Sequence, residues 1–148
     1  MAGVALAIFG GNLLKKKAEQ FLNGIGYKFS NVKLKIVGFT KLQVSGILTV
    51  TNQNSLGGTV QYFKGNLKYG QKGGTIMPIN VSAFQLPPHG SASTNFVSEI
   101  PLLQLASNIL DVVNSVIGGD LKKLWLTGSL LTTFIAIPVD TEISILSA

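Results

Sequence analysis

Cysteine and arginine are absent from this chain of 148 residues, and histidine occurs once, as His89. Without cysteine the chain has no disulfide, no thiolate metal site and no thiol nucleophile. A single histidine excludes a histidine-rich metal centre, and His89 lies in a Pro-Pro-His-Gly turn without a Gly-x-Ser-x-Gly motif. We therefore predict no enzymatic activity, no metal, no cofactor and no small-molecule substrate.

Charged residues are scarce as well, at 12% of the chain, while hydrophobic residues make up 46%. The acids are scattered singly, and Asp140 and Glu142 form the one close pair. Two positions apart on a strand, they share a face, and such a pair is typically exposed to solvent. The composition thus predicts a single folded domain with a substantial core and few groups for acid–base chemistry.

The positive charge is concentrated in the first half of the chain. Residues 1–72 hold ten lysines and one acid, a net charge of +9, whereas residues 73–148 hold two lysines and five acids, a net charge of −3. A basic half is attracted to an anionic membrane surface, nucleic acid or acidic partner, or it keeps an apolar domain soluble.

Weak nucleic-acid binding through the lysine-rich half is a possible function, although nucleic acid is not the expected partner. Arginine, the usual residue for bidentate recognition, is missing, and Tyr62 is the one exposed ring predicted near the lysines. The lysines that could form a shared phosphate-binding surface are Lys33, Lys35, Lys41, Lys64 and Lys68.

Residues 1–25 are predicted to form an anchor or arm, separate from a domain at 26–148. Ala2–Phe9 is apolar but far shorter than a membrane span, and positive charge follows it, unlike in a secretory signal. From Asn12 to about Leu22 the spacing predicts a basic amphipathic helix. The expected location is cytoplasmic, membrane-peripheral or within a virion. The side chains of this arm predicted to contact a membrane or partner are Leu14, Lys15, Lys16, Lys17 and Phe21.

After Tyr27 the hydrophobic period changes to two, which is typical of half-buried strands. Glycine and proline turns separate the segments, and this arrangement predicts an antiparallel β-sandwich or barrel. The predicted strands are 32–36, 42–51, 59–69, 76–86, 92–100, a long strand over 124–136, and a short edge strand at 141–146.

One helix, at about 102–117, is predicted to interrupt the strands. Its apolar residues recur at helical spacing, with Pro101 near its start and Gly118-Gly119 at its end. In the long strand that follows, Trp125 faces outward, because the residues in the core phase are Leu124, Leu126, Leu130, Phe134 and Ala136. We therefore predict Trp125 as a partner contact.

Several short motifs, in order over residues 32–146, resemble the LEA-2 (WHy) domain family. They include Leu48–Asn54, where the family has a hydrophobic strand running into Asn-Pro-Asn and this chain has Gln53 for proline. The remaining motifs are Leu67–Gly70, Phe84–Ser91, the helix after Ile100-Pro101-Leu102, Leu126–Leu130 and Ile137–Val139. The resemblance implies an immunoglobulin- or fibronectin III-like sandwich with one inserted helix, an association with desiccation or stress protection, and no catalytic residues.

Three functions follow from these observations. The leading one is a non-enzymatic structural or interaction module, anchored through residues 1–25 to a membrane surface or to a larger assembly such as a virion or envelope complex. Its expected partner is another protein or a second copy of the chain. The second is a soluble stress protectant, as the family resemblance implies, and the third is nucleic-acid binding through the lysine-rich half.

Overall fold

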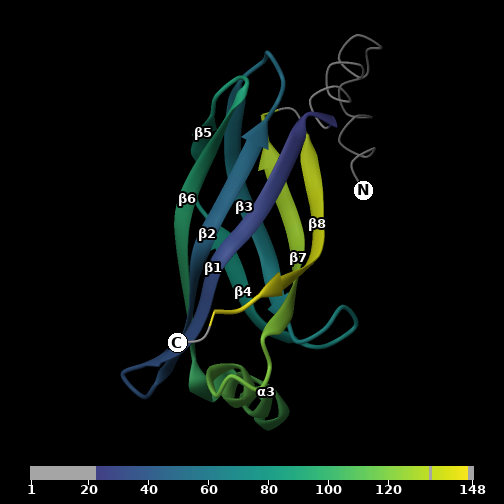
Figure 1. Ribbon diagram of the computed structural model, residues 1–148. Helices are drawn as coiled ribbons and strands as arrows, with labels where there is room; N and C mark the ends of the chain where they lie inside the picture. The colour runs from purple at the N-terminus through teal and green to yellow at the C-terminus, as the bar shows by residue number, and fades with distance from the viewer. Residues whose placement is uncertain (1–22, 134, 147–148) are drawn as a thin grey trace.

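A computed structural model describes residues 23–133 and 135–146 as two antiparallel sheets that face each other (Figure 1). The three-stranded sheet has the order β1-β2-β6; the five-stranded sheet has the order β4-β3-β7-β8, and β5 pairs with β3. The elements are β1 (Ile25–Val37), β2 (Lys41–Asn52), β3 (Gly58–Lys68), β4 (Thr75–Val81), β5 (Phe84–Leu86), β6 (Gly90–Pro101), the 3₁₀-helix η1 (Leu102–Gln104), α3 (Ser107–Ile117), β7 (Lys123–Thr132) and β8 (Ala136–Ser144).

The hydrophobic core lies between the sheets, where the alternation along each strand places it. In β2, Leu42, Val44 and Leu48 are fully buried, and the residues between them face outward or are small. Because side chains of a strand alternate between its two faces, one apolar series per strand is enough to form this core. The predicted mainly β fold with two antiparallel sheets is confirmed, while the immunoglobulin or fibronectin III affiliation stays a prediction.

An aromatic cluster joins the sheets in the middle of the core. The ring centroid of Phe29 on β1 lies 5.2 Å from that of Phe63 on β3 and 6.2 Å from that of Phe96 on β6, and both pairs are edge to face. Aromatic pairs prefer this offset geometry, and each adds about 0.5–1.5 kcal/mol beyond the area it buries.

The predicted helix at 102–117 is shorter than expected. The first residues form η1, and Leu105 and Ala106 are extended, with ψ angles of 135° and 153°, so α3 begins only at Ser107. This break turns the helix so that Ile109, Val113 and Val116 are buried at the lower end of the sandwich in Figure 1. The predicted end at Gly118-Gly119 is confirmed, and Gly119 has a φ of +85°, which glycine adopts without strain.

The segment predicted as one strand, 76–86, forms two. β4 pairs with β3 from Phe63 to Lys68, whereas β5 pairs with the start of β3, from Gly58 to Val60. Between these two stretches β3 carries a bulge at Gln61 in its pairing with β7. A bulge bends and twists a strand locally, and one straight neighbour cannot follow both halves.

The prediction of one long strand over 124–136 is also wrong, because a tight turn divides this segment between β7 and β8. The hydroxyl of Thr132 donates to the carbonyl of Ile135 (2.8 Å) and accepts from its N–H (3.2 Å), which closes the turn without glycine or asparagine. Reversal of the chain changes the phase: Ile135 and Ile137 are buried, and Ala136, expected in the core, is only half-buried. The predicted core residue Phe134 lies outside the described residues.

Candidate functional site

Trp125 lies on the outer face of the five-stranded sheet, as predicted. Its neighbours on β7, Leu124 and Leu126, are 2% exposed and face the core, so the indole points away from the core and is half-buried. The indole Nε1 donates a hydrogen bond to Asp140 on the adjacent strand β8. A charge-assisted bond of this kind restrains the orientation of the indole ring.

The two acids predicted as a solvent-exposed pair lie on this same outer face. Asp140 and Glu142 are both exposed on β8, and Glu142 is the cross-strand partner of Trp125. Glu142 also lies 3.5 Å from the ammonium of Lys123. Each acid therefore has a partner, one an indole and the other an ammonium group.

A second ring occupies the other end of the same face. Tyr62 on β3 is half-buried and faces outward, and the Nζ of Lys64 lies 4.7 Å from its ring centroid. We call these residues the tryptophan face: Tyr62, Lys64, Trp125, Asp140 and Glu142. It combines two amphipathic rings with charges of both signs, a composition typical of surfaces that contact proteins.

The five lysines considered for phosphate binding do not share one surface. Lys33, Lys35 and Lys41 are exposed on the three-stranded sheet, and the ammonium of Lys41 lies 3.8 Å from Glu99. Lys64 and Lys68 belong to β3 and face outward from the other sheet. The basic residues are therefore divided between opposite faces of the sandwich.

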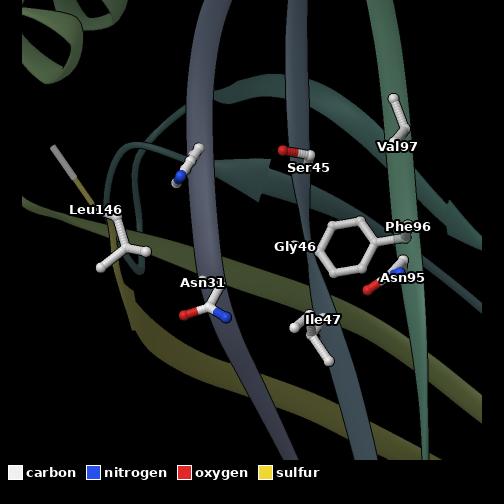
Figure 2. Close-up of a pocket in the computed structure, with 9 residues that line it drawn as sticks. Asn31, Ser45, Gly46, Ile47, Asn95, Phe96, Val97 and Leu146 are labelled. Carbon is white, nitrogen blue, oxygen red and sulfur yellow. The ribbon is translucent and has the colours of Figure 1, made fainter. Parts of the chain in front are cut away.

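A shallow depression of about 450 Å³ lies on the outer face of the three-stranded sheet (Figure 2). Gly46 on β2 lies at its floor, and the missing side chain would point inward, where a Cβ would lie 2.7 Å from the ring of Phe96. The depression is lined by Asn31, Lys33, Ser45, Gly46, Ile47, Asn95, Phe96, Val97 and Leu146.

His89 is an exposed turn residue with a φ of +48°, as expected for a solvated loop position. Its N–H donates to the carbonyl of Asn54 (2.9 Å). Over residues 23–133 and 135–146, no group of three or more His, Asp or Glu side chains is arranged to hold a metal ion. Within the same ranges, no helix is long and apolar enough to cross a membrane.

The Asn52-Gln53-Asn54 motif organises this end of the sandwich, a role that the sequence did not reveal. Asn52 is 1% exposed, and its amide donates to the carbonyls of Leu56 and Pro87, both at 3.0 Å. The N–H of Gln53 donates to the carbonyl of Gly24 (2.9 Å), a bond that a proline at this position could not make.

Most residues predicted for the arm cannot be placed, since residues 1–22 lie outside the described part of the chain. This group includes Leu14, Lys15, Lys16, Lys17 and Phe21. Ile25, the last residue of the predicted arm, begins β1 and packs against the core. Asp140 is the residue of the tryptophan face whose role was missed, and its position two residues from the partner of Trp125 becomes visible only when the strand register is known.

No protein-family model matches the sequence, and no curated protein matches it either. Among solved structures, an X-ray structure of a Northeast Structural Genomics Consortium target is similar at a TM-score of 0.50 and 9% identity, over 84% of this chain and 88% of that one. A protein from Archaeoglobus fulgidus gives 0.43 and 9%, over 84% and 97%. A candidate late embryogenesis abundant (LEA) protein gives 0.41 and 15%, over 89% and 81%. Likeness at this level concerns the fold alone, and membership of the LEA-2 family stays a prediction.

Proposed function

We propose that this chain is a non-enzymatic structural or interaction module. In this proposal the sandwich presents the tryptophan face to a protein partner, and residues 1–25 attach it to a membrane surface or to a larger assembly such as a virion or envelope complex. The observation that carries the proposal is the bond between Trp125 and Asp140, which holds a large, half-buried ring on an outer face.

An oriented ring is suited to binding because little freedom is left to lose. An ordered side chain at an interface usually costs about 0.5–1.5 kcal/mol in lost rotamer freedom. Since Asp140 already holds the indole, contact with a partner would avoid much of that cost. Tryptophan is also among the residues that contribute most to protein interfaces.

Attachment through the arm is tested by flotation of the full chain with vesicles that contain 30 mol% anionic lipid. We expect the chain to float and a Lys15→Gln/Lys16→Gln/Lys17→Gln variant to remain at the bottom. The matched control, Lys33→Gln/Lys35→Gln/Lys41→Gln, removes equal charge from the three-stranded sheet and should float like the original chain. If the original chain does not float, attachment to membranes is rejected, and if both variants lose flotation, the arm is not the attachment site.

Contact through the tryptophan face is tested by fluorescence, because Trp125 is the chain's one tryptophan. Acrylamide quenching is compared between the isolated chain and the complex recovered from its native source. We expect quenching to fall several-fold in the complex, and Trp125→Ala to weaken the complex while Tyr69→Ala, an exposed ring outside the tryptophan face, leaves it intact. Unchanged quenching would remove this face from the proposal.

Stress protection is the second candidate function, and the LEA-2-like motifs in the sequence favour it. The measurement is the recovery of a client enzyme after drying with an equimolar amount of this chain or of an inert globular protein. Better recovery with this chain would support the stress-protective function, and equal recovery would reject it.

A further inference from the structure

The outer strands of both sheets have one side without a neighbouring strand. In the three-stranded sheet these strands are β1 and β6, and in the five-stranded sheet they are β4 and β8, with β5 beside β3. Free backbone N–H and C=O groups on such a side pair readily with a strand from another molecule, unless proline, charge or a bulge prevents it.

Three of these sides carry such features. β1 has a register shift against β2, and Ile145 bridges it at Val32. Pro78 lies in the short strand β4, and Pro138 lies in β8 together with the charged Asp140. A strand from another molecule would meet a missing donor, a charge or an occupied backbone group at each of them.

From Gly90 to Ser98, β6 has no proline, no charge and no register shift. It is 12 residues long and pairs with β2 in unbroken register from Asn52–Gly90 to Lys41–Pro101, with no proline before its last residue and no lysine. Its one charge, Glu99, already interacts with Lys41 (3.8 Å) and with the amide of Gln43 (2.9 Å).

β6 also lies where another strand could reach it. Figure 1 shows it along the left edge of the molecule, and within the described residues it pairs with β2 alone. Pro87 and Pro88 lie near its first residues, at a cleft lined also by Ser91 and Ala92. The stretch from Ser93 to Pro101 lies beyond that cleft.

We propose that β6 pairs with β6 of a second copy of this chain, antiparallel about a two-fold axis, to form a continuous six-stranded sheet. The composition favours a second copy because the strand is complementary to itself. The middle of β6 lies near Asn95 and Phe96, so the two Glu99 side chains would be roughly 24 Å apart at 3.4 Å per residue. Each would face a neutral residue instead of a like charge.

The outward side chains near the middle of β6 suit such a junction. Ser93, Asn95 and Val97 are neutral, and Val97 is 59% exposed, unusual for a valine on a strand. Pairing across the axis would place these side chains against those of the other copy and cover part of the apolar surface of Val97. The proposal goes beyond the proposed function and involves neither residues 1–25 nor the tryptophan face.

The first test is sedimentation of the full chain between 5 and 200 µM. We expect a species of twice the 15.7 kDa chain mass, and we expect Asn95→Lys to raise the dimer dissociation constant at least tenfold, because two added lysines would meet at the axis. Asn66→Lys, the same substitution on the exposed face of β3, is the matched control and should dimerise like the original chain. A monomer throughout this range, or equal behaviour of the two variants, overturns the proposal.

The second test uses the absence of cysteine from the chain. Single variants Ser93→Cys, Asn95→Cys and Val97→Cys are oxidised, and disulfide-linked dimer is measured on denaturing gels beside Asn66→Cys. At least one β6 position should crosslink five-fold more than the control, and the best position reports the register. If no β6 position exceeds the control, the pairing is rejected, even when Asn95→Lys is unfolded and uninformative.

Vesicle flotation of the folded Asn95→Lys variant separates this proposal from the proposed function. Loss of dimer with unchanged flotation supports β6 pairing independently of the arm. Loss of flotation with the dimer intact in the Lys15→Gln/Lys16→Gln/Lys17→Gln variant likewise assigns attachment to the arm and association to β6. A dimer that dissociates only in the arm variant would overturn the β6 proposal.

Discussion

Gly65 on β3 and Gly128 on β7 face each other as a cross-strand pair, with the ring of Phe63 beside both. A Cβ on Gly128 would lie 2.6 Å from the Cα of Gly65 and 2.9 Å from the Phe63 ring. The two strands therefore bring their backbones together under an aromatic ring, an arrangement that any side chain at either position would disrupt. This contact fixes the central pair of strands in the sheet that carries Trp125.

The first prediction concerns this pair. Gly128→Ala should lower the free energy of unfolding by about 1–3 kcal/mol, the usual cost of forcing extra atoms into a packed site. The control is Gly26→Ala, since a Cβ there meets nothing within 4 Å and alanine should stabilise a strand by about 0.5–1 kcal/mol. Urea denaturation measures both. Equal effects would mean that the Gly65–Gly128 contact does not limit side-chain size.

The second prediction concerns the hydrogen bond between the Trp125 indole and Asp140. Asp140→Ala removes the acceptor of the indole N–H and should increase acrylamide quenching of the single tryptophan, because the ring can then move. Asp140→Asn keeps an acceptor oxygen and should behave like the original chain. Glu142→Gln, at the cross-strand partner of Trp125, serves as the charge control. Equal quenching of all four proteins would contradict the positioning role of Asp140.

The third prediction concerns the turn between β7 and β8. Thr132→Val keeps the shape of the side chain but leaves buried groups of Ile135 without the hydroxyl, and should cost about 1–3 kcal/mol of stability. Thr127→Val, on the outer face of the same strand, should change stability by less than about 0.5 kcal/mol. Thermal unfolding followed by circular dichroism compares the two variants. A smaller loss at Thr132 than at Thr127 would show that the hydroxyl does not stabilise the turn.

The fourth prediction concerns Asn52, whose amide joins two loops. Asn52→Asp removes both donated hydrogen bonds at a buried position and should destabilise the domain by about 1–3 kcal/mol. The matched control, Asn66→Asp, is exposed on β3 and should be close to neutral. Hydrogen exchange of the Asn52→Asp variant should become faster mainly in the loops near Leu56 and Pro87. Uniform exchange across the domain would instead indicate a global effect.

Much of the fold could be read from local patterns because each strand carries its own signal. Alternation in β2 places Leu42, Val44 and Leu48 in the core, and the same reasoning turned Trp125 outward on β7. Both assignments depend on the geometry of one extended strand, which holds whatever its neighbours are.

The errors occurred where distant parts of the chain decide the local structure. The residues around the turn, 131–136, include no glycine, proline or asparagine, so the segment 124–136 resembles one strand. The turn at Thr132 forms because β8 pairs back along β7 and the hydroxyl of Thr132 satisfies Ile135. The division of β4 from β5 likewise depends on a bulge in β3, and no residue of either short strand indicates that bulge.

The sequence by itself determined the mainly β class, the alternating core and the outward direction of Trp125, because each follows from the periodicity of a single strand. The absence of cysteine and arginine is likewise read directly from the composition. Only the tertiary structure decided that Asp140 holds the Trp125 ring, that the lysines divide between two faces, and that β6 lies at the side of its sheet. These depend on register and strand order, which arise from pairing between segments far apart in the chain.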